Sequence, residues 1–170
     1  MKTLFLIAVL SITALSFGGA KPADYSGNWT LDMKQSKNLP KYYERIQSHK
    51  LNITQDEKLL NVRVEIGREQ NEPEKIDLAY NLDGSETKTE MKIRTQDGLL
   101  SVPTTLKAVV KDEGKLEIII TREVPMPDKT FKGITVEDWE LSVDGKTLTI
   151  HKTDTAPWGT MESEMVFVRA

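Results

Sequence analysis

The fold is decided by the stretch Trp139-Glu140-Leu141-Ser142-Val143-Asp144-Gly145-Lys146-Thr147-Leu148-Thr149-Ile150. Apolar residues alternate with polar ones on both sides of Asp144-Gly145, which is the period of a β-strand with one buried face. Asp-Gly between two such segments is a strong signal of a two-residue hairpin turn. The stretch therefore predicts two antiparallel strands joined by a tight turn.

The same alternation recurs along the rest of the chain, and turn residues interrupt it about every ten positions. The alternating segments are 28–33, 49–53, 60–66, 76–82, 90–94, 106–110, 116–121, 134–143, 148–150 and 161–169. Tight connections favour an up-and-down antiparallel barrel of about nine or ten strands over a sandwich, which usually needs long crossings. The longest expected connections are 95–103 and 125–129. The predicted fold class is thus all-β.

Within 134–143 the alternation changes phase. Ile134 and Val136 share one parity, whereas Trp139 and Leu141 take the other. A strand whose faces exchange in this way usually contains a β-bulge. We therefore expect a bulge near Glu137-Asp138.

One segment does not alternate. Ser36–Gln47 has a capping serine, an early proline at position 40, and Leu39, Tyr43 and Ile46 spaced three and four apart. This spacing predicts one short helix after the first strand. Such a short helix is unstable alone, so it must pack on the barrel.

The N-terminus predicts export. Lys2 is followed by an apolar run from Leu4 to Phe17 and by the small residues Gly18-Gly19-Ala20, which together form a signal peptide. We expect residues 1–20 to be removed and residues 21–170 to form one domain; cleavage after Ser16 and a retained membrane anchor are the alternatives. The chain has no cysteine, and an exported domain without disulfides fits a periplasmic or secreted bacterial protein.

Gly27-Asn28-Trp29, which opens the first strand, resembles the Gly-x-Trp signature of the lipocalin and calycin group. The stretch 26–32 with Ser36, and the segments 139–142 and 144–149, also resemble exported bacterial lipocalin-like proteins. The resemblance implies a barrel that is closed at one end by the first strand and often open to a small ligand at the other. It also implies that Trp29 packs against an arginine near the last strand, here Arg169. The absence of cysteines and the helix after strand one depart from classical lipocalins.

Composition and motifs argue against several function classes. The net charge is −3 and no run of basic residues occurs, so nucleic acid is not an expected partner. The only histidines are His49, expected to face inward, and His151, expected to face outward, which is no arrangement for a metal. No cofactor or nucleophile motif is present, and the carboxylate pairs at 138/140 and 162/164 are expected on outer strand faces. The chain is therefore predicted not to be an enzyme, with no cofactor and no bound metal.

Parity also selects a candidate ligand-binding set on the inward faces of the strands. Its members are Tyr80, Ile93, Ala108, Ile120, Arg122 and Trp139. An arginine inside a barrel needs a partner; a ligand carboxylate, Glu123, another nearby acid and solvent are the alternatives.

Two functions follow. The first is binding of a small apolar or amphipathic ligand in the barrel lumen, with no membrane span left after signal cleavage. The second is a ligand-free interaction or structural module of the bacterial cell envelope. The module would use an apolar patch formed by Pro125-Met126-Pro127 and Ala156-Pro157-Trp158-Gly159, loops that could equally surround the mouth of a binding site. A cavity above ~300 Å³ would favour the binder.

Overall fold

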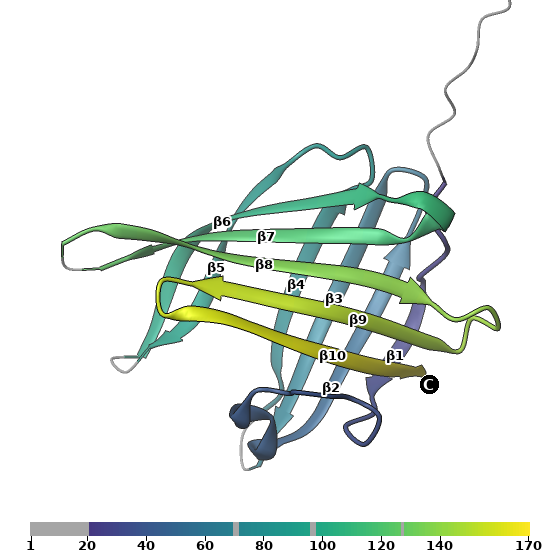
Figure 1. The fold of residues 1–170 in the computed structure, drawn as a ribbon, viewed down its shortest axis with the longest axis horizontal. Helices are drawn as coiled ribbons and strands as arrows, with labels where there is room; N and C mark the ends of the chain where they lie inside the picture. Colours follow the sequence, from purple (N-terminus) through teal and green to yellow (C-terminus); the bar gives the residue numbers. More distant parts are fainter. Residues whose placement is uncertain (1–20, 70–71, 96–97, 127) are drawn as a thin grey trace, which may run out of the picture.

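The computed structural model is a single antiparallel sheet of ten strands, rolled into a nearly closed barrel (Figure 1). It describes residues 21–69, 72–95, 98–126 and 128–170, so the expected signal peptide, residues 1–20, lies outside the described residues. The strands are β1 (Gly27–Leu31), β2 (Ile46–Gln55), β3 (Leu59–Arg68), β4 (Glu74–Asn81), β5 (Thr87–Thr95), β6 (Gly98–Val110), β7 (Leu116–Pro125), β8 (Thr130–Leu141), β9 (Thr147–Ala156) and β10 (Gly159–Arg169). Two 3-10 turns, η1 (Lys41–Arg45) and η2 (Asp112–Gly114), complete the assigned elements. The predicted all-β, up-and-down barrel is confirmed.

The barrel closes between the ends of the chain. β1 pairs with β2 on one side and with β10 on the other, with Trp29 directly opposite Arg169. All other strands that are consecutive in sequence are hydrogen-bonded to each other, with the exception of β4 and β5. These two strands form the two edges of the sheet. This unpaired seam is the reason that the barrel is nearly, rather than fully, closed.

One end of the barrel, near β1 and the C-terminus, is filled by Tyr25, which is fully buried. The Tyr25 hydroxyl lies 3.0 Å from the carbonyl oxygen of Trp139 and 3.3 Å from that of Gly114. The Tyr25 carbonyl oxygen accepts a hydrogen bond of 3.0 Å from Trp29 Nε1. Burial raises the pKa of Tyr25 to about 12, so the hydroxyl stays protonated as a donor. We call this the closed end, and the opposite end, at the β5–β6, β7–β8 and β9–β10 turns, the open end.

The helix expected at 36–47 is present only as the 3-10 turn η1. Ser36 Oγ instead donates to the carbonyl oxygen of Asp32 at 2.7 Å and accepts from the Val166 N–H at 3.0 Å. Ile46 already belongs to β2 and pairs with Arg68 of β3. Strand pairing therefore takes the residues that a longer helix would need, and a single turn remains.

The predicted bulge near Glu137-Asp138 is wrong. The pairing of β8 with β9 runs without a shift from Ile134 to Leu141, so the strand keeps one parity throughout. Ile134 is consequently 38% exposed on the outer face, and the polar Thr135 and Glu137 face inward with Trp139.

The connection expected at 95–103 is shorter than predicted, because β6 begins at Gly98 and contains Pro103. Pro103 pairs with Glu90 of β5, and pairing with β7 begins only at Thr104. Pro103 thus sits where β6 has a single paired neighbour, an edge-like position that tolerates proline. No helix in the described ranges is long and apolar enough to cross a membrane.

Candidate binding site

A cavity of about 390 Å³ lies at the open end of the barrel. β5, β7, β8, β9 and the β9–β10 turn supply its lining: Ile93, Arg122, Val124, Met126, Phe131, Gly133, Ile134, Thr135, Asp154, Thr155, Ala156 and Trp158. We call it the mouth cavity. Its volume falls in the range of small-molecule sites and exceeds the ~300 Å³ expected of a binder.

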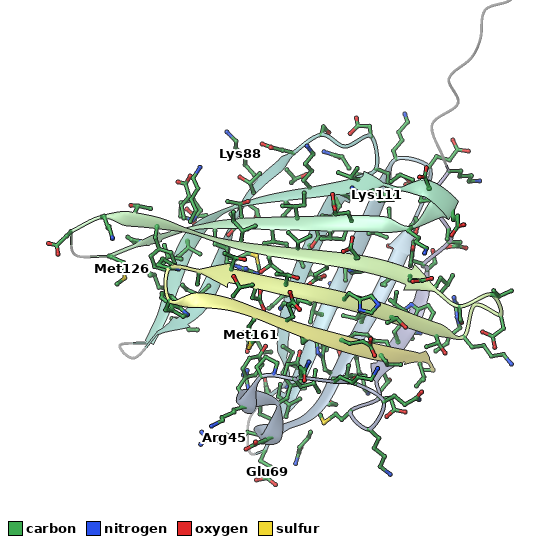
Figure 2. The ribbon with its side chains drawn as sticks, viewed as in Figure 1. Arg45, Glu69, Lys88, Lys111, Met126 and Met161 are labelled. Carbon is green, nitrogen blue, oxygen red and sulfur yellow. The ribbon has the colours of Figure 1, made fainter. Side chains whose placement is uncertain are left out.

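Aromatic and sulfur side chains form the rim of the mouth cavity. The rings of Phe131 and Trp158 lie edge to face, with centroids 5.2 Å apart. Met126, at the tip of the projecting β7–β8 hairpin (Figure 2), is 50% exposed, and Trp158 is 77% exposed. The two apolar loops singled out in the sequence therefore come together at the mouth; Pro127 lies outside the described residues.

Small residues make the room inside this rim. Gly133 of β8 lies directly opposite Arg122 of β7. A Cβ atom added at Gly133 would meet nothing nearer than Phe131 Cε2, at 4.0 Å. On the β9 side, the small side chain of Ala156 likewise takes up little of the cavity. The absence of a side chain at Gly133 therefore leaves open space beside the Arg122 guanidinium.

Hydrogen-bonding side chains form the floor of the mouth cavity. Arg122 Nη1 donates to Thr135 Oγ1 at 2.9 Å, and the Thr135 hydroxyl in turn donates to Asp154 Oδ1 at 2.6 Å. The second Asp154 oxygen, Oδ2, lies 3.2 Å from Lys152 Nζ. Thr135 and Asp154 are directly opposed in the β8–β9 ladder, which brings their side chains into contact.

Below this floor, Glu137 and Lys152 form the next opposed pair of the same ladder. The Lys152 side chain is only 20% exposed. Burial opposes its charge, but the carboxylates of Glu137 and Asp154 outweigh that penalty and raise the pKa of Lys152. Glu137 Oε2 also accepts a hydrogen bond of 3.0 Å from Trp139 Nε1. We call the set Arg122, Thr135, Glu137, Lys152 and Asp154 the polar wall.

The structure brings two of the six predicted site residues to the mouth cavity, Ile93 and Arg122. Ile120 is buried beside it, directly opposite Thr135. The remaining three, Tyr80, Ala108 and Trp139, are packed in the core. That any of the six contacts a ligand stays a prediction.

Four members of the polar wall were not predicted from the sequence. Leu148 and Ile150 face inward. The same alternation, continued two and four residues beyond Ile150, would have placed Lys152 and Asp154 on the inner face as well. Thr135 and Glu137 were missed because the expected bulge assigned them to the outside.

A second buried polar pair is formed by Tyr43 and His49. The Tyr43 hydroxyl, carried by η1, lies 3.0 Å from Nδ1 of His49 on β2. Burial, with a smaller effect of Lys152, lowers the pKa of His49 to about 4, so this imidazole is neutral at pH 7. His151 is exposed, as parity predicted. Among the described residues, no cluster of three or more acidic, histidine or cysteine side chains could hold a metal ion.

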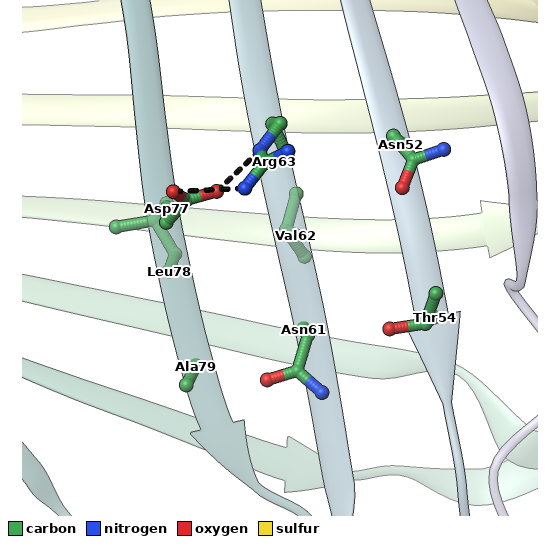
Figure 3. A pocket seen from close by; sticks show the side chains of 8 residues that line it. All are labelled: Asn52, Thr54, Asn61, Val62, Arg63, Asp77, Leu78 and Ala79. Carbon is green, nitrogen blue, oxygen red and sulfur yellow. Dashed lines mark hydrogen bonds and ion pairs between the residues drawn. The ribbon is translucent and has the colours of Figure 1, made fainter.

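Two further hollows differ from the mouth cavity in their surroundings. The larger, about 910 Å³, lies along the seam and is lined by charged side chains that include Arg45, Lys75 and Glu90. The other, about 380 Å³, crosses the outer faces of β2, β3 and β4 (Figure 3). Its most prominent feature is the ion pair of Arg63 and Asp77, both exposed, with Nε and Oδ1 2.7 Å apart. Neither combines apolar walls with a buried polar floor.

Comparison with known proteins gives a likeness in architecture alone. No family model matches the chain, and no curated protein matches it. Among solved structures, the chain is similar to zebrafish ileal bile acid-binding protein in complex with cholic acid, with 14% identity over 86% of this chain and 98% of that one and a TM-score of 0.45. It is also similar to apocrustacyanin C2, with 14% identity over 86% of this chain and 61% of that one and a TM-score of 0.38. The strand pairing described above defines the barrel independently of both.

Proposed function

We propose that the protein binds a small apolar or amphipathic ligand in the mouth cavity. The observation that carries this proposal is the combination of an exposed aromatic rim with a hydrogen-bonded polar floor in one concave site. Apolar walls with a few placed polar groups are typical of small-molecule sites. Binding is favoured over catalysis because the hydroxyl of the polar wall, on Thr135, is buried and already bonded to Arg122 and Asp154 of the same wall.

We further propose that the protein is exported from a bacterial cell, to the periplasm or beyond, after residues 1–20 are removed. The order of a charged start, an apolar run and small residues supports this proposal. Intact-mass measurement of the protein purified from its own host tests it. A mass that begins at Lys21 is expected, and a mass that includes residues 1–20 would contradict export with cleavage.

Binding is tested by filling the mouth cavity. Gly133→Trp should abolish uptake of a fluorescent fatty-acid-like probe, because the new ring occupies the open space beside Arg122. Lys132→Trp is the matched control, since residue 132 is exposed on the outer face of the same strand. Undiminished uptake by a folded Gly133→Trp variant would reject the mouth cavity as the site.

The exposed Trp158 also favours a second candidate, an interaction module of the cell envelope that uses the rim as a contact surface. Native mass spectrometry of the protein from its own host separates the two. A retained small molecule supports the binder. A retained protein partner that is lost in Trp158→Ala, with no small molecule, supports the module.

A further inference from the structure

We infer that the ligand of the mouth cavity carries an uncharged hydrogen-bonding head group, such as a hydroxyl, amide or ester, in place of a carboxylate or an amine. The inference rests on the proposed function and specifies the chemistry of its ligand.

The charges of the polar wall balance one another. The polar wall contains two cations, Arg122 and Lys152, and two carboxylates, Glu137 and Asp154. Both Asp154 oxygens are engaged, one by the Thr135 hydroxyl and the other by Lys152. Within the described residues the wall is therefore electrically neutral, and its anions already have partners.

A charged head group would disturb this balance. A ligand carboxylate would add a third anion beside Asp154, and once desolvated it would leave the polar wall with an excess negative charge. A ligand ammonium would face Arg122 and Lys152, and it would find the oxygens of Asp154 already occupied. Either charge would lose its hydration and would leave the five residues of the polar wall with a net charge.

Arg122 also offers hydrogen-bond donors to the mouth cavity. A guanidinium has five N–H groups, and Arg122 directs only Nη1 to a partner, Thr135, among the described residues. Arg122 also lines the mouth cavity, so its remaining N–H groups are available there. A neutral oxygen acceptor can use these donors without changing the net charge, while Phe131, Val124 and Ile93 contact the apolar body.

The test compares three ligands that share a ten-carbon chain: 1-decanol, decanoate and decylamine. Their dissociation constants are measured by calorimetry at pH 7.5, below the concentration at which they aggregate. We expect 1-decanol to bind at least about tenfold more tightly than either charged ligand. Decanoate binding more tightly than 1-decanol would overturn the inference and leave the proposed function standing. Absence of binding by all three would overturn the proposed function and the inference together.

A charge variant provides the second arm. Asp154→Asn keeps the shape and an oxygen acceptor for Thr135, but it leaves the wall with one excess positive charge. Decanoate should then gain at least about tenfold relative to 1-decanol. Asp138→Asn, on the exposed face of β8, is the matched control and should leave the ranking unchanged. An unchanged ranking in a folded Asp154→Asn variant would overturn the inference.

Discussion

The guanidinium carbon of Arg169 lies 4.4 Å from the centroid of the Trp29 ring, over the indole of the residue directly opposite in the β1–β10 ladder. Arg169 Nε donates to the carbonyl oxygen of Gly145 and Nη1 to that of Ser26, both at 2.8 Å. One side chain thus ties the last strand to the first strand and to the β8–β9 turn. The contact expected from the resemblance to lipocalins is confirmed.

This contact should be measurable as a coupling energy. A double-mutant cycle with Trp29→Phe and Arg169→Met should give about 0.5–2 kcal/mol between the two side chains, from urea unfolding. Arg63, which is exposed on β3, provides the control cycle. Trp29→Phe and Arg63→Met should be additive within about 0.5 kcal/mol. Equal coupling in both cycles would contradict a specific contact.

Gly27 should be required because of the same arginine. A Cβ atom at Gly27 would lie 2.7 Å from Arg169 Nη1, and the Gly27 φ of +143° is unfavourable for any other residue. We expect Gly27→Ala to cost about 1–3 kcal/mol of unfolding free energy. Gly159→Ala is the control for backbone strain alone, since Gly159 has a φ of +140° and no atom within 4 Å of an added Cβ. A cost for Gly27→Ala no larger than that of the control would show that the arginine does not restrict this site.

His49 should make stability depend on pH between about 4 and 6.5. The folded pKa of about 4 lies below the ordinary value of 6.5, so the unfolded chain binds a proton first as the pH falls. The contribution of neutral His49 is complete above pH 6.5 and is lost toward pH 4. Between pH 7 and pH 5 this amounts to about 2 kcal/mol.

Urea unfolding at pH 7 and pH 5 measures this loss. His49→Gln should remove most of the difference, whereas His151→Gln, a change on the exposed face of β9, should retain it. The aspartates with lowered pKa values titrate below this window, so they add little to the comparison. A full pH dependence in the His49→Gln variant would refute the assignment.

Lys152 should be costly to neutralise. Lys152→Met leaves Glu137 and Asp154 facing the lumen without their shared cation. Removing one partner of a buried ion pair costs about 3–5 kcal/mol of unfolding free energy. Because the Lys152 side chain is 20% exposed, we expect a loss of about 3 kcal/mol or less. Lys50→Met, on the exposed face of β2, should change the unfolding free energy by less than about 0.5 kcal/mol. Equal effects of the two substitutions would show that the polar wall does not depend on Lys152.

The barrel was predictable from sequence because its signal is repeated in nearly every strand. Leu60, Val62 and Leu78 of β3 and β4, for example, alternate with exposed neighbours. Trp29 and Arg169 were predictable as a pair because, when an up-and-down barrel closes, the second edge of the first strand pairs with the last strand.

The candidate site was harder to predict, because it breaks the rule that revealed the barrel. In β8 the apolar Ile134 faces solvent and the charged Glu137 faces the lumen. A pattern of buried apolar residues cannot identify a strand whose inner face is polar, and the phase change was mistaken for a bulge. The partners that make this inversion tolerable, Lys152 and Asp154, come from β9, so they become apparent only once the register of the two strands is known.

The pairing of β1 with β10 has a consequence for how the chain folds. Hairpins such as β8–β9 form from residues that are close in sequence. In contrast, one edge of β1 stays unpaired until β10, which ends at Arg169, is in place. Contacts between residues so far apart in sequence slow folding, because the chain loses the entropy of loop closure before these contacts stabilise it. Until the final strand arrives, the edges of β1 and β9 are both open to pairing with another molecule. The incomplete chain is therefore the aggregation-prone species, and completing the last strand removes both edges at once.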